Sequence, residues 1–310
     1  MPHLALTIGD PTGIGPEITA KALQRLSEFE DLELTVIGDI KSLEKTAEDL
    51  KLRLPQSDDI HYHNIEATLP GSTAYKAIEA AVKMIAAKEA DILVTGPISK
   101  RNLHAADYSY NGHTEILEAL ASEYFETKDA HAEMLFVYKK FRMLLLTRHV
   151  PLKEVPELLA KPGAVARPLK ALIRFLRDHV KIEEPNIAIL GVNPHVGEVG
   201  GDEEMKFIKP VIHAVNAIGA TNLAGPFPAD GFFRGFNAAT TEYDAIVAAY
   251  HDQGLIPFKL LAGYEAVNVT IGLPFIRTSV SHGTAEDIVG KGVADEASLM
   301  AALHEALHLM

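Results

Sequence analysis

The sequence predicts an α/β fold with a largely parallel sheet, divided into two lobes. Three observations support this prediction: eight short apolar runs without polar alternation, amphipathic helical patterns between them, and a length of 310 residues. Apolar runs of this kind indicate strands buried on both faces. Their alternation with helices is typical of a parallel sheet. Because a single core stops growing at about 250–300 residues, the length favours two lobes.

The strands are expected where Val, Ile and Leu gather. In chain order these runs lie at 4–9, 34–38, 92–96, 132–138, 143–147, 187–192, 245–250 and 266–272. Side chains of this kind pack well on a pleated surface. Since only four residues separate the fourth run from the fifth, we expect these two strands to pair as a hairpin.

Amphipathic helices are expected between the strands and near the C-terminus. Apolar residues recur three and four positions apart at 73–88, 163–180, 202–218 and 296–309. This spacing places them on one face of a helix. A shorter helix is expected to open at Pro16, because proline is favoured in the first turn. Asp202 is typical of an N-cap, with Glu203 and Glu204 in the first turn, so we interpret these acids as structural.

The composition excludes several kinds of site and partner. The chain has no cysteine, which excludes disulfides and thiolate metal sites. Its formal net charge of −13 argues against nucleic acid as the main partner, since phosphate backbones require a basic face. No apolar run approaches the roughly 20 residues of a membrane helix. The N-terminus, MPHLALTIGD, lacks the basic segment and cleavage site of a signal peptide, so we expect a cytoplasmic protein.

Three histidines stand immediately beyond an apolar run. They are His149 in LLLTRHVPL, His195 in ILGVNPHVGE and His251 in AAYHDQG. Ligands of open α/β sheets bind beyond the carboxyl ends of the strands, which parallel strands bring together. Three imidazoles there would bind a cation such as Zn²⁺ and leave positions for substrate. Alternatively each histidine hydrogen-bonds a carbonyl at its strand end, but the recurrence at three strand ends favours the metal site.

Asp252, which follows His251, has two interpretations. Its carboxylate could support the neighbouring imidazole or act as a general base. A solvated turn acid explains the same residue equally well, so both interpretations stay open.

Other residues indicate contacts with a small anion. His113 and Thr114 begin a predicted helix, where free amide groups attract anions, although Thr114 could simply cap that helix. Lys259 and Arg277 could hold phosphate or carboxylate, Arg277 through paired N–H groups. The glycine-rich TIGDPTGIGPEI at 7–18 is neither a P-loop nor a Rossmann fingerprint, so we interpret it as a structural turn.

Eight motifs, taken together, resemble a known family. They are GDPTGIGPE, TGPISK, GHTE, NPHVGE, GPFPAD, YHDQGLIPFK, VNVTIGLPFIRTS and HGTAEDIVGKG, in order over nearly the whole chain. The set closely resembles the 4-hydroxythreonine-4-phosphate dehydrogenase family of vitamin B6 biosynthesis. The last motif, at 282–292, also resembles the adenosine-binding loop of isopropylmalate and isocitrate dehydrogenases, whose fold this family shares.

The resemblance implies a two-lobed α/β/α subunit of the isocitrate and isopropylmalate dehydrogenase type. Residues 1–125 and 283–310 would form the first lobe, and residues 126–282 the second lobe, with the dimerisation surface and the metal ligands. A homodimer is implied, with the active site in the interdomain cleft at the dimer interface.

The resemblance also assigns roles to residues. It implies metal binding by His149, His195 and His251, one of them from the partner subunit. Substrate contact is implied for His113, Thr114, Lys259, Asn268 and Arg277, and cofactor contact for His282, Gly283, Thr284 and Asp287. Asp252 and Lys259 are the candidate catalytic residues, and Gly254 is expected to form the bend between His251 and Lys259. The implied cofactors are a divalent metal (Zn, Mg or Co) and NAD or NADP.

The implied activity is oxidation and decarboxylation of 4-phosphooxy-L-threonine in pyridoxal phosphate biosynthesis. Asn111, Arg148 and Gly231 depart from the usual family pattern. We expect these positions to face the non-phosphate end of the substrate. D-erythronate 4-phosphate and D-threonate 4-phosphate therefore stay alternative substrates. A phosphate acyltransferase of related topology is a further alternative, which needs no three-histidine metal site.

Overall fold

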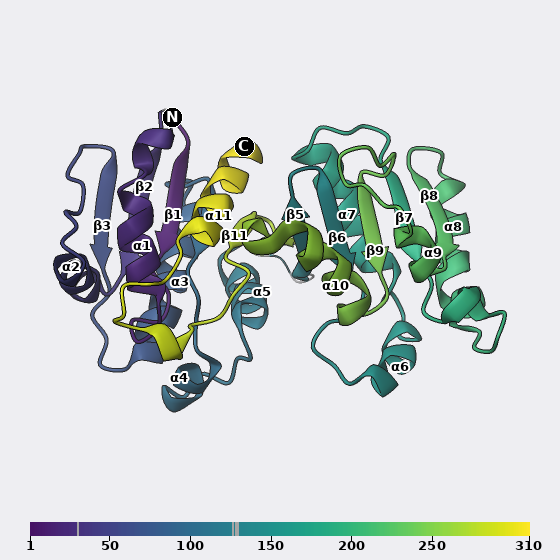
Figure 1. The fold of residues 1–310 in the computed structure, drawn as a ribbon, viewed down its shortest axis with the longest axis horizontal. Helices are drawn as coiled ribbons and strands as arrows, with labels where there is room; N and C mark the ends of the chain where they lie inside the picture. The colour runs from purple at the N-terminus through teal and green to yellow at the C-terminus, as the bar shows by residue number, and fades with distance from the viewer. Residues whose placement is uncertain (30, 126, 128–129) are drawn as a thin grey trace. The chain divides into compact units, whose positions relative to one another are not determined.

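The computed structural model describes residues 1–29, 31–125, 127 and 130–310, which fold into two compact units (Figure 1). Unit 1 consists of Met1–Ala132 and Tyr264–Met310, and unit 2 of Glu133–Gly263. The sequence-based division places 264–282 in the second lobe. The structure groups this stretch with unit 1, because its two strands, 267–271 and 277–279, join the sheet of that unit.

Unit 1 is built on a mostly parallel sheet. Its strands are β1 (His3–Thr7), β2 (Glu33–Gly38), β3 (Ile60–Asn64), β4 (Ile92–Thr95), β10 (Val267–Ile271) and β11 (Arg277–Ser279). They lie in the order β3-β2-β1-β4-β11-β10, and β10 runs antiparallel to β11. Leu4, Ala5 and Leu6 of β1 are fully buried, as expected for a strand covered on both faces.

Helices pack around this sheet. They are α1 (Gly15–Leu23), α2 (Ile40–Asp49), α3 (Pro70–Ala86), α4 (Lys100–Ala105), α5 (His113–Tyr124) and α11 (Ala297–His308), with short turns η1 (Leu26–Glu28), η5 (Gly263–Glu265) and η6 (Glu286–Ile288). The apolar face of α3, with Ala77, Ile78 and Ala81, is buried in the core beside Leu93 of β4. The helical spacing read from the sequence at 73–88 therefore marks the core face.

Unit 2 contains five further strands: β5 (Glu133–Tyr138), β6 (Phe141–Leu145), β7 (Asn186–Leu190), β8 (Asn222–Phe227) and β9 (Ala245–Ala248). Their order is β5-β6-β9-β7-β8, and only the β5–β6 pair is antiparallel. The helices are α6 (Val155–Leu159), α7 (Ala166–Asp178), α8 (Lys209–Asn216), α9 (Ala229–Phe233) and α10 (His251–Ala262). Short 3-10 helices are η2 (Leu152–Glu154) and η3 (Pro194–Gly197), and η4 (Glu204–Ile208) is a π-helical segment before α8.

The α/β prediction and the hairpin between β5 and β6 are confirmed, the latter by the facing pair Tyr138 and Phe141. All eight predicted strands are present. Strands β3, β8 and β11 had no apolar signal in the sequence, because they are partly exposed or very short. No helix in the described ranges is long and apolar enough to cross a membrane.

Candidate active site

Two of the three predicted metal-binding histidines lie together in unit 2. His149 follows β6, and His251 is the first residue of α10, directly after β9. Strands β6 and β9 are parallel neighbours, so their carboxyl ends lie side by side. The two imidazole rings have centroids 5.5 Å apart and planes inclined by 52°. The strand-end rule therefore predicts this pair correctly.

His251 has the hydrogen bonding of a metal-ligating histidine. Its Nδ1 donates to Asp252 Oδ1 at 2.7 Å. A carboxylate accepting from one ring nitrogen fixes the tautomer and leaves Nε2 as the basic atom, which is the usual support of a metal-bound imidazole. The donor set thus fits a divalent cation, with Asp252 as the orienting partner of His251.

His195 does not join this pair within one subunit. Among the residues that the structure describes, no three side chains of His, Cys, Asp or Glu are arranged to hold a metal ion. His195 is exposed in η3, with a backbone φ of 53°, and Val196 has a φ of 60°. A left-handed conformation is costly for a branched residue such as Val196, and such strain gathers at functional loops. A third ligand from the partner subunit stays a prediction.

The carboxylate of Glu204 holds this strained loop in place. Glu204 is fully buried, and its Oε1 accepts from the backbone N–H groups of Val192 and Asn193, both at 2.7 Å. Its Oε2 accepts from the Asn193 side chain at 3.1 Å. Burial raises the pKa of Glu204, but the hydrogen bonds from Asn193 and Val192 outweigh it, and the net pKa lies below the ordinary value. Glu204 is structural, as interpreted from the sequence, and its role is to shape the His195 loop.

Replacing Glu204 with glutamine is expected to destabilise the protein by about 1–3 kcal/mol, because an amide cannot accept all three hydrogen bonds. A lowered folded-state pKa stabilises the fold above the unfolded pKa, and this contribution is lost as the pH falls through the folded pKa. The difference in melting temperature between wild type and Glu204→Gln should therefore be largest near neutral pH and shrink in acid. Glu198→Gln, an exposed change in the same loop, is the control. Equal melting curves at all pH values would contradict this role.

A cavity of about 350 Å³ in unit 2 surrounds the histidine pair. Polar and charged side chains line one part of it, and apolar side chains the other: Arg148, His149, Tyr250, His251 and Asp252, with Val150, Pro151, Leu152 and Val155. All of these residues follow β6 or β9. The space is large enough for a small organic acid.

Gly254 lies inside α10, so the expected bend at this residue is wrong. A Cβ atom at position 254 would stand 2.7 Å from Leu145 Cδ2 and 2.9 Å from Ala248 Cβ. Glycine is required here because α10 packs closely on β6 and β9. Lys259 lies in the last turn of this helix and is exposed.

A second set of predicted residues lies in unit 1, around Arg277. The guanidinium is buried, donates to Thr95 Oγ1 from Nε (2.9 Å) and Nη2 (2.6 Å), and to Thr270 Oγ1 from Nη1 (3.2 Å). No carboxylate in the described part of the chain lies within 4.0 Å of it. Burial lowers the pKa of Arg277 to about 9. In the described residues this buried cation is paired with hydroxyl groups alone, which is the environment expected of an anion-binding arginine.

His113, at the start of α5, lies beside this cation. The pKa of His113 lies well below its ordinary value, mainly because the ring is buried and also because Arg277 is positively charged. The imidazole is therefore neutral. His113 Nε2 and Asn268 Oδ1 are buried, and neither has a hydrogen-bond partner among the described residues. A bound ligand would satisfy such atoms. The helix is capped by Gly112, so the alternative that Thr114 serves as the N-cap is wrong.

The predicted cofactor loop, 282–292, packs on the glycine-rich turn that follows β1. Ile14 N donates to Thr284 O at 3.0 Å, and a Cβ on Gly13 would lie 2.8 Å from Thr284 Cβ. His282 Nδ1 donates to Gly283 O at 2.9 Å, and its buried Nε2 has no partner in the described chain. An unpaired acceptor beside a close glycine turn fits a nicotinamide cofactor. Asp287 lies exposed in η6.

The turn at 7–18 has the structural role expected from its sequence. The carboxylate of the buried Asp10 accepts from Thr12 N at 2.9 Å, from Thr12 Oγ1 at 2.7 Å and from Asn102 Nδ2 at 2.8 Å. This network joins the turn to α4.

Sequence reasoning missed Thr95 and Thr270, the hydroxyl partners of Arg277. Thr95 ends the apolar run ILVT, and a polar residue at the carboxyl end of a strand was the available signal. Thr270 had no signal in the sequence, since the residue pattern of a short strand does not show which side chains lie on the neighbouring strand.

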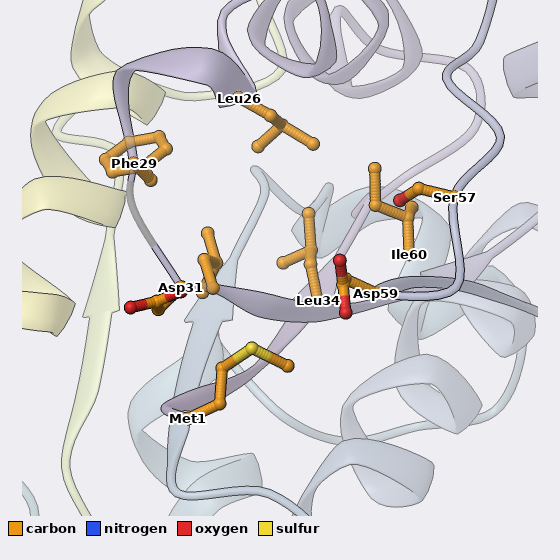
Figure 2. A pocket seen from close by; sticks show the side chains of 9 residues that line it. Met1, Leu26, Phe29, Asp31, Leu34, Ser57, Asp59 and Ile60 are labelled. Atoms are coloured by element: carbon orange, nitrogen blue, oxygen red, sulfur yellow. The ribbon is translucent and has the colours of Figure 1, made fainter.

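A further cavity, of about 220 Å³, lies at the opposite ends of the unit 1 strands (Figure 2). Met1, Asp31 and Asp59 precede β1, β2 and β3, and Leu26 and Phe29 add apolar walls. Ligands of such sheets bind at the carboxyl ends of the strands, so we do not assign the reaction to this cavity.

Comparisons with known proteins agree with these features. The family profile described as "Pyridoxal phosphate biosynthetic protein PdxA" matches residues 9–306. A 4-hydroxythreonine-4-phosphate dehydrogenase of Thermosynechococcus vestitus is 40% identical, over 97% of this chain and 94% of its own length. A D-threonate 4-phosphate dehydrogenase of Cupriavidus necator is 38% identical, over 100% of this chain and 97% of its own length.

A solved structure is also similar. The crystal structure of 4-hydroxythreonine-4-phosphate dehydrogenase from Klebsiella pneumoniae has a TM-score of 0.83 and 33% identity, and the match covers 100% of this chain and 99% of that one. The profile and these full-length relatives show that the chain is a dehydrogenase and belongs to the PdxA family.

Proposed function

We propose that this protein is a metal-dependent, NAD(P)-linked dehydrogenase that oxidises the 3-hydroxyl group of a four-carbon acid phosphorylated at C4. The observation that carries the proposal is the buried guanidinium of Arg277, which has hydroxyl partners but no carboxylate within 4.0 Å among the described residues. Its positive charge and N–H donors match a phosphate group. His113 and Asn268, whose side chains have unpaired buried atoms among the described residues, are proposed to contact other parts of the substrate. Thr114 and Lys259 are proposed as further phosphate contacts.

His149 and His251 are proposed to hold a divalent cation, Zn²⁺, Mg²⁺ or Co²⁺, with His195 as the third ligand. When bound, the cation polarises the substrate hydroxyl and lowers its pKa. Asp252 orients His251 through its Oδ1 atom. Its second oxygen is the proposed general base that takes the hydroxyl proton, while the hydride passes to NAD⁺ or NADP⁺.

The loop with His282, Gly283, Thr284 and Asp287 is proposed to bind the adenosine part of this cofactor. The product of the oxidation is a 3-oxo acid, and loss of its carboxylate as CO₂ completes the reaction. Two substrates correspond to the names of the relatives: 4-phosphooxy-L-threonine, as in pyridoxal phosphate biosynthesis, and D-threonate 4-phosphate. D-erythronate 4-phosphate has the same functional groups as the second and differs from it in stereochemistry.

A side-by-side assay tests this function. The purified protein is incubated with each of the three phosphorylated acids, with NAD⁺ or NADP⁺ and with each metal, and the reduced cofactor is followed by absorbance. Metal-dependent reduction with at least one acid is expected. No reduction with any combination would reject the proposal.

A homodimer is supported by the outer face of α10, the helix that begins with His251. Ile256, Leu260 and Leu261 are exposed on it, Leu260 by 81%. Apolar side chains gathered in this way are typical of a surface that a partner covers. Leu260→Glu is expected to yield monomers in size-exclusion chromatography with light scattering, whereas Ile218→Glu, an exposed apolar residue outside this face, should leave dimers. Monomeric wild-type protein would contradict the homodimer.

A further inference from the structure

We infer that Arg148 determines which four-carbon acid the site accepts, by favouring a 2-hydroxy acid over an acid with an ammonium group at C2. The inference deepens the proposed function and rests on it. It comes from the unit 2 cavity, where a fixed positive charge lies next to the histidine pair.

The structure holds Arg148 at the wall of this cavity. The residue lies between the end of β6 and His149, and it lines the same space as His149, His251 and Asp252. Its Nη2 atom lies 3.9 Å from Oε2 of Glu133, a nearly buried residue at the start of β5. The Arg148 side chain keeps 29% of its surface exposed. This ion pair anchors the guanidinium without removing it from the cavity.

The proposed reaction brings C2 of the substrate close to this guanidinium. The cation that activates the 3-hydroxyl group would be held by His149 and His251, and C2 is bonded to the reacting carbon. The phosphate at C4 lies on the other side of that carbon. The substituent at C2 and the C1 carboxylate therefore occupy the cavity that Arg148 lines.

Hydrogen-bonding capacity separates the two substrate classes at this point. Arginine carries five N–H donors and no acceptor. A hydroxyl oxygen at C2 accepts from such a donor, whereas an ammonium group has only donors and cannot pair with it. The carboxylate at C1 is common to both classes, so its attraction to Arg148 does not discriminate.

Charge acts in the same direction. An ammonium group in this cavity would meet both the divalent cation and the permanent charge of Arg148, and like charges at short range repel strongly. Among the described residues, Glu133 pairs with Arg148, and Asp252 accepts from His251 Nδ1 through Oδ1, while its second oxygen is proposed to take the proton of the reacting hydroxyl. The balance favours a neutral hydroxyl group at C2.

The test measures binding as well as turnover. Dissociation constants of D-threonate 4-phosphate, D-erythronate 4-phosphate and 4-phosphooxy-L-threonine are determined by calorimetry on chelator-treated protein, and kcat/KM is measured on metal-loaded protein. Wild type is expected to prefer the hydroxy acids. Arg148→Gln should shift the preference toward the amino acid by about tenfold or more, equivalent to about 1.4 kcal/mol. Arg148→Lys keeps a positive charge without an acceptor and should keep the wild-type preference.

Two controls make the outcome decisive. Arg174→Gln removes an equal charge from the exposed face of α7 and should leave the preference unchanged. Melting temperatures show whether each variant is folded. If Arg148→Gln does not fold, Arg148→Met, which also removes the charge and the donors, takes its place in the comparison. If the ratio of hydroxy-acid affinity to amino-acid affinity is the same in wild type and Arg148→Gln, the inference about Arg148 is wrong, while the proposed function still stands. If wild type neither binds nor oxidises any of the acids, the proposed function fails as well.

Discussion

Replacing Arg277 with methionine is expected to lower kcat/KM for the phosphorylated acid by roughly 30- to 4000-fold without destabilising the fold. Removing one partner of a buried, charged hydrogen bond to an anion costs about 2–5 kcal/mol of binding free energy, which gives this range. In the free protein, however, the buried guanidinium donates hydrogen bonds to the hydroxyl groups of Thr95 and Thr270, with no carboxylate within 4.0 Å among the described residues. Replacing such a buried charge by an apolar side chain is often neutral or stabilising.

The two effects are separated by measuring affinity and melting temperature on the same samples. Arg277→Met should bind the substrate weakly yet melt at or above the wild-type temperature. Arg25→Met, which removes an exposed arginine that pairs with Glu28 far from this position, is the matched control and should keep wild-type affinity. A variant that loses stability and affinity together would show that Arg277 acts mainly as a structural residue.

The pH dependence of binding gives a second test of Arg277. Burial lowers its pKa to about 9. Since only the charged form attracts an anion, affinity for the phosphorylated acid should be complete below this pH and fall as the pH rises through it. Arg277→Met should lack this fall. Calorimetric titrations between pH 7 and 10 would detect the difference, and identical profiles would contradict the assignment.

The apolar strands could be predicted because burial on both faces leaves a continuous hydrophobic signal. Two other strands have no such hydrophobic signal. Strand β3 has the polar sequence IHYHN, and β11 consists only of Arg277, Thr278 and Ser279. The second of these carries Arg277, the proposed phosphate contact. A polar residue in a buried strand breaks the hydrophobic pattern of that strand, and such exceptions concentrate at functional sites.

The candidate site was predictable only as far as neighbouring strands determine it. His149 and His251 follow strands that pair in register, so the order of the sheet brings them together. His195 depends on a left-handed loop that is shaped by Glu204, and no local pattern announces that conformation. The expected bend at Gly254 failed for a related reason, because a glycine needed for helix packing has the same local sequence as a glycine in a turn.

Replacing His251 with alanine is expected to lower metal affinity by more than about 100-fold and to abolish turnover, because it removes one of two paired imidazoles. Asp252→Asn should be milder, with about 10- to 100-fold weaker metal binding, since supporting residues of metal-bound histidines contribute effects of this size. An asparagine that keeps a carbonyl acceptor for His251 Nδ1 retains the tautomer but loses the negative charge.

Metal content, measured after dialysis against a buffered metal solution, distinguishes the two roles of Asp252. If Asp252 mainly orients His251, metal content and turnover should fall together in Asp252→Asn, and excess metal should restore turnover. If Asp252 is the general base, saturating metal should leave a loss in kcat that shrinks as the pH rises, because hydroxide can then replace the missing carboxylate. His304→Ala, an exposed histidine of α11 in unit 1, is the control for losing an imidazole. Full metal content in His251→Ala would show that His251 is not a metal ligand. The hydrogen bond from its Nδ1 to Asp252 would then have no role in metal binding.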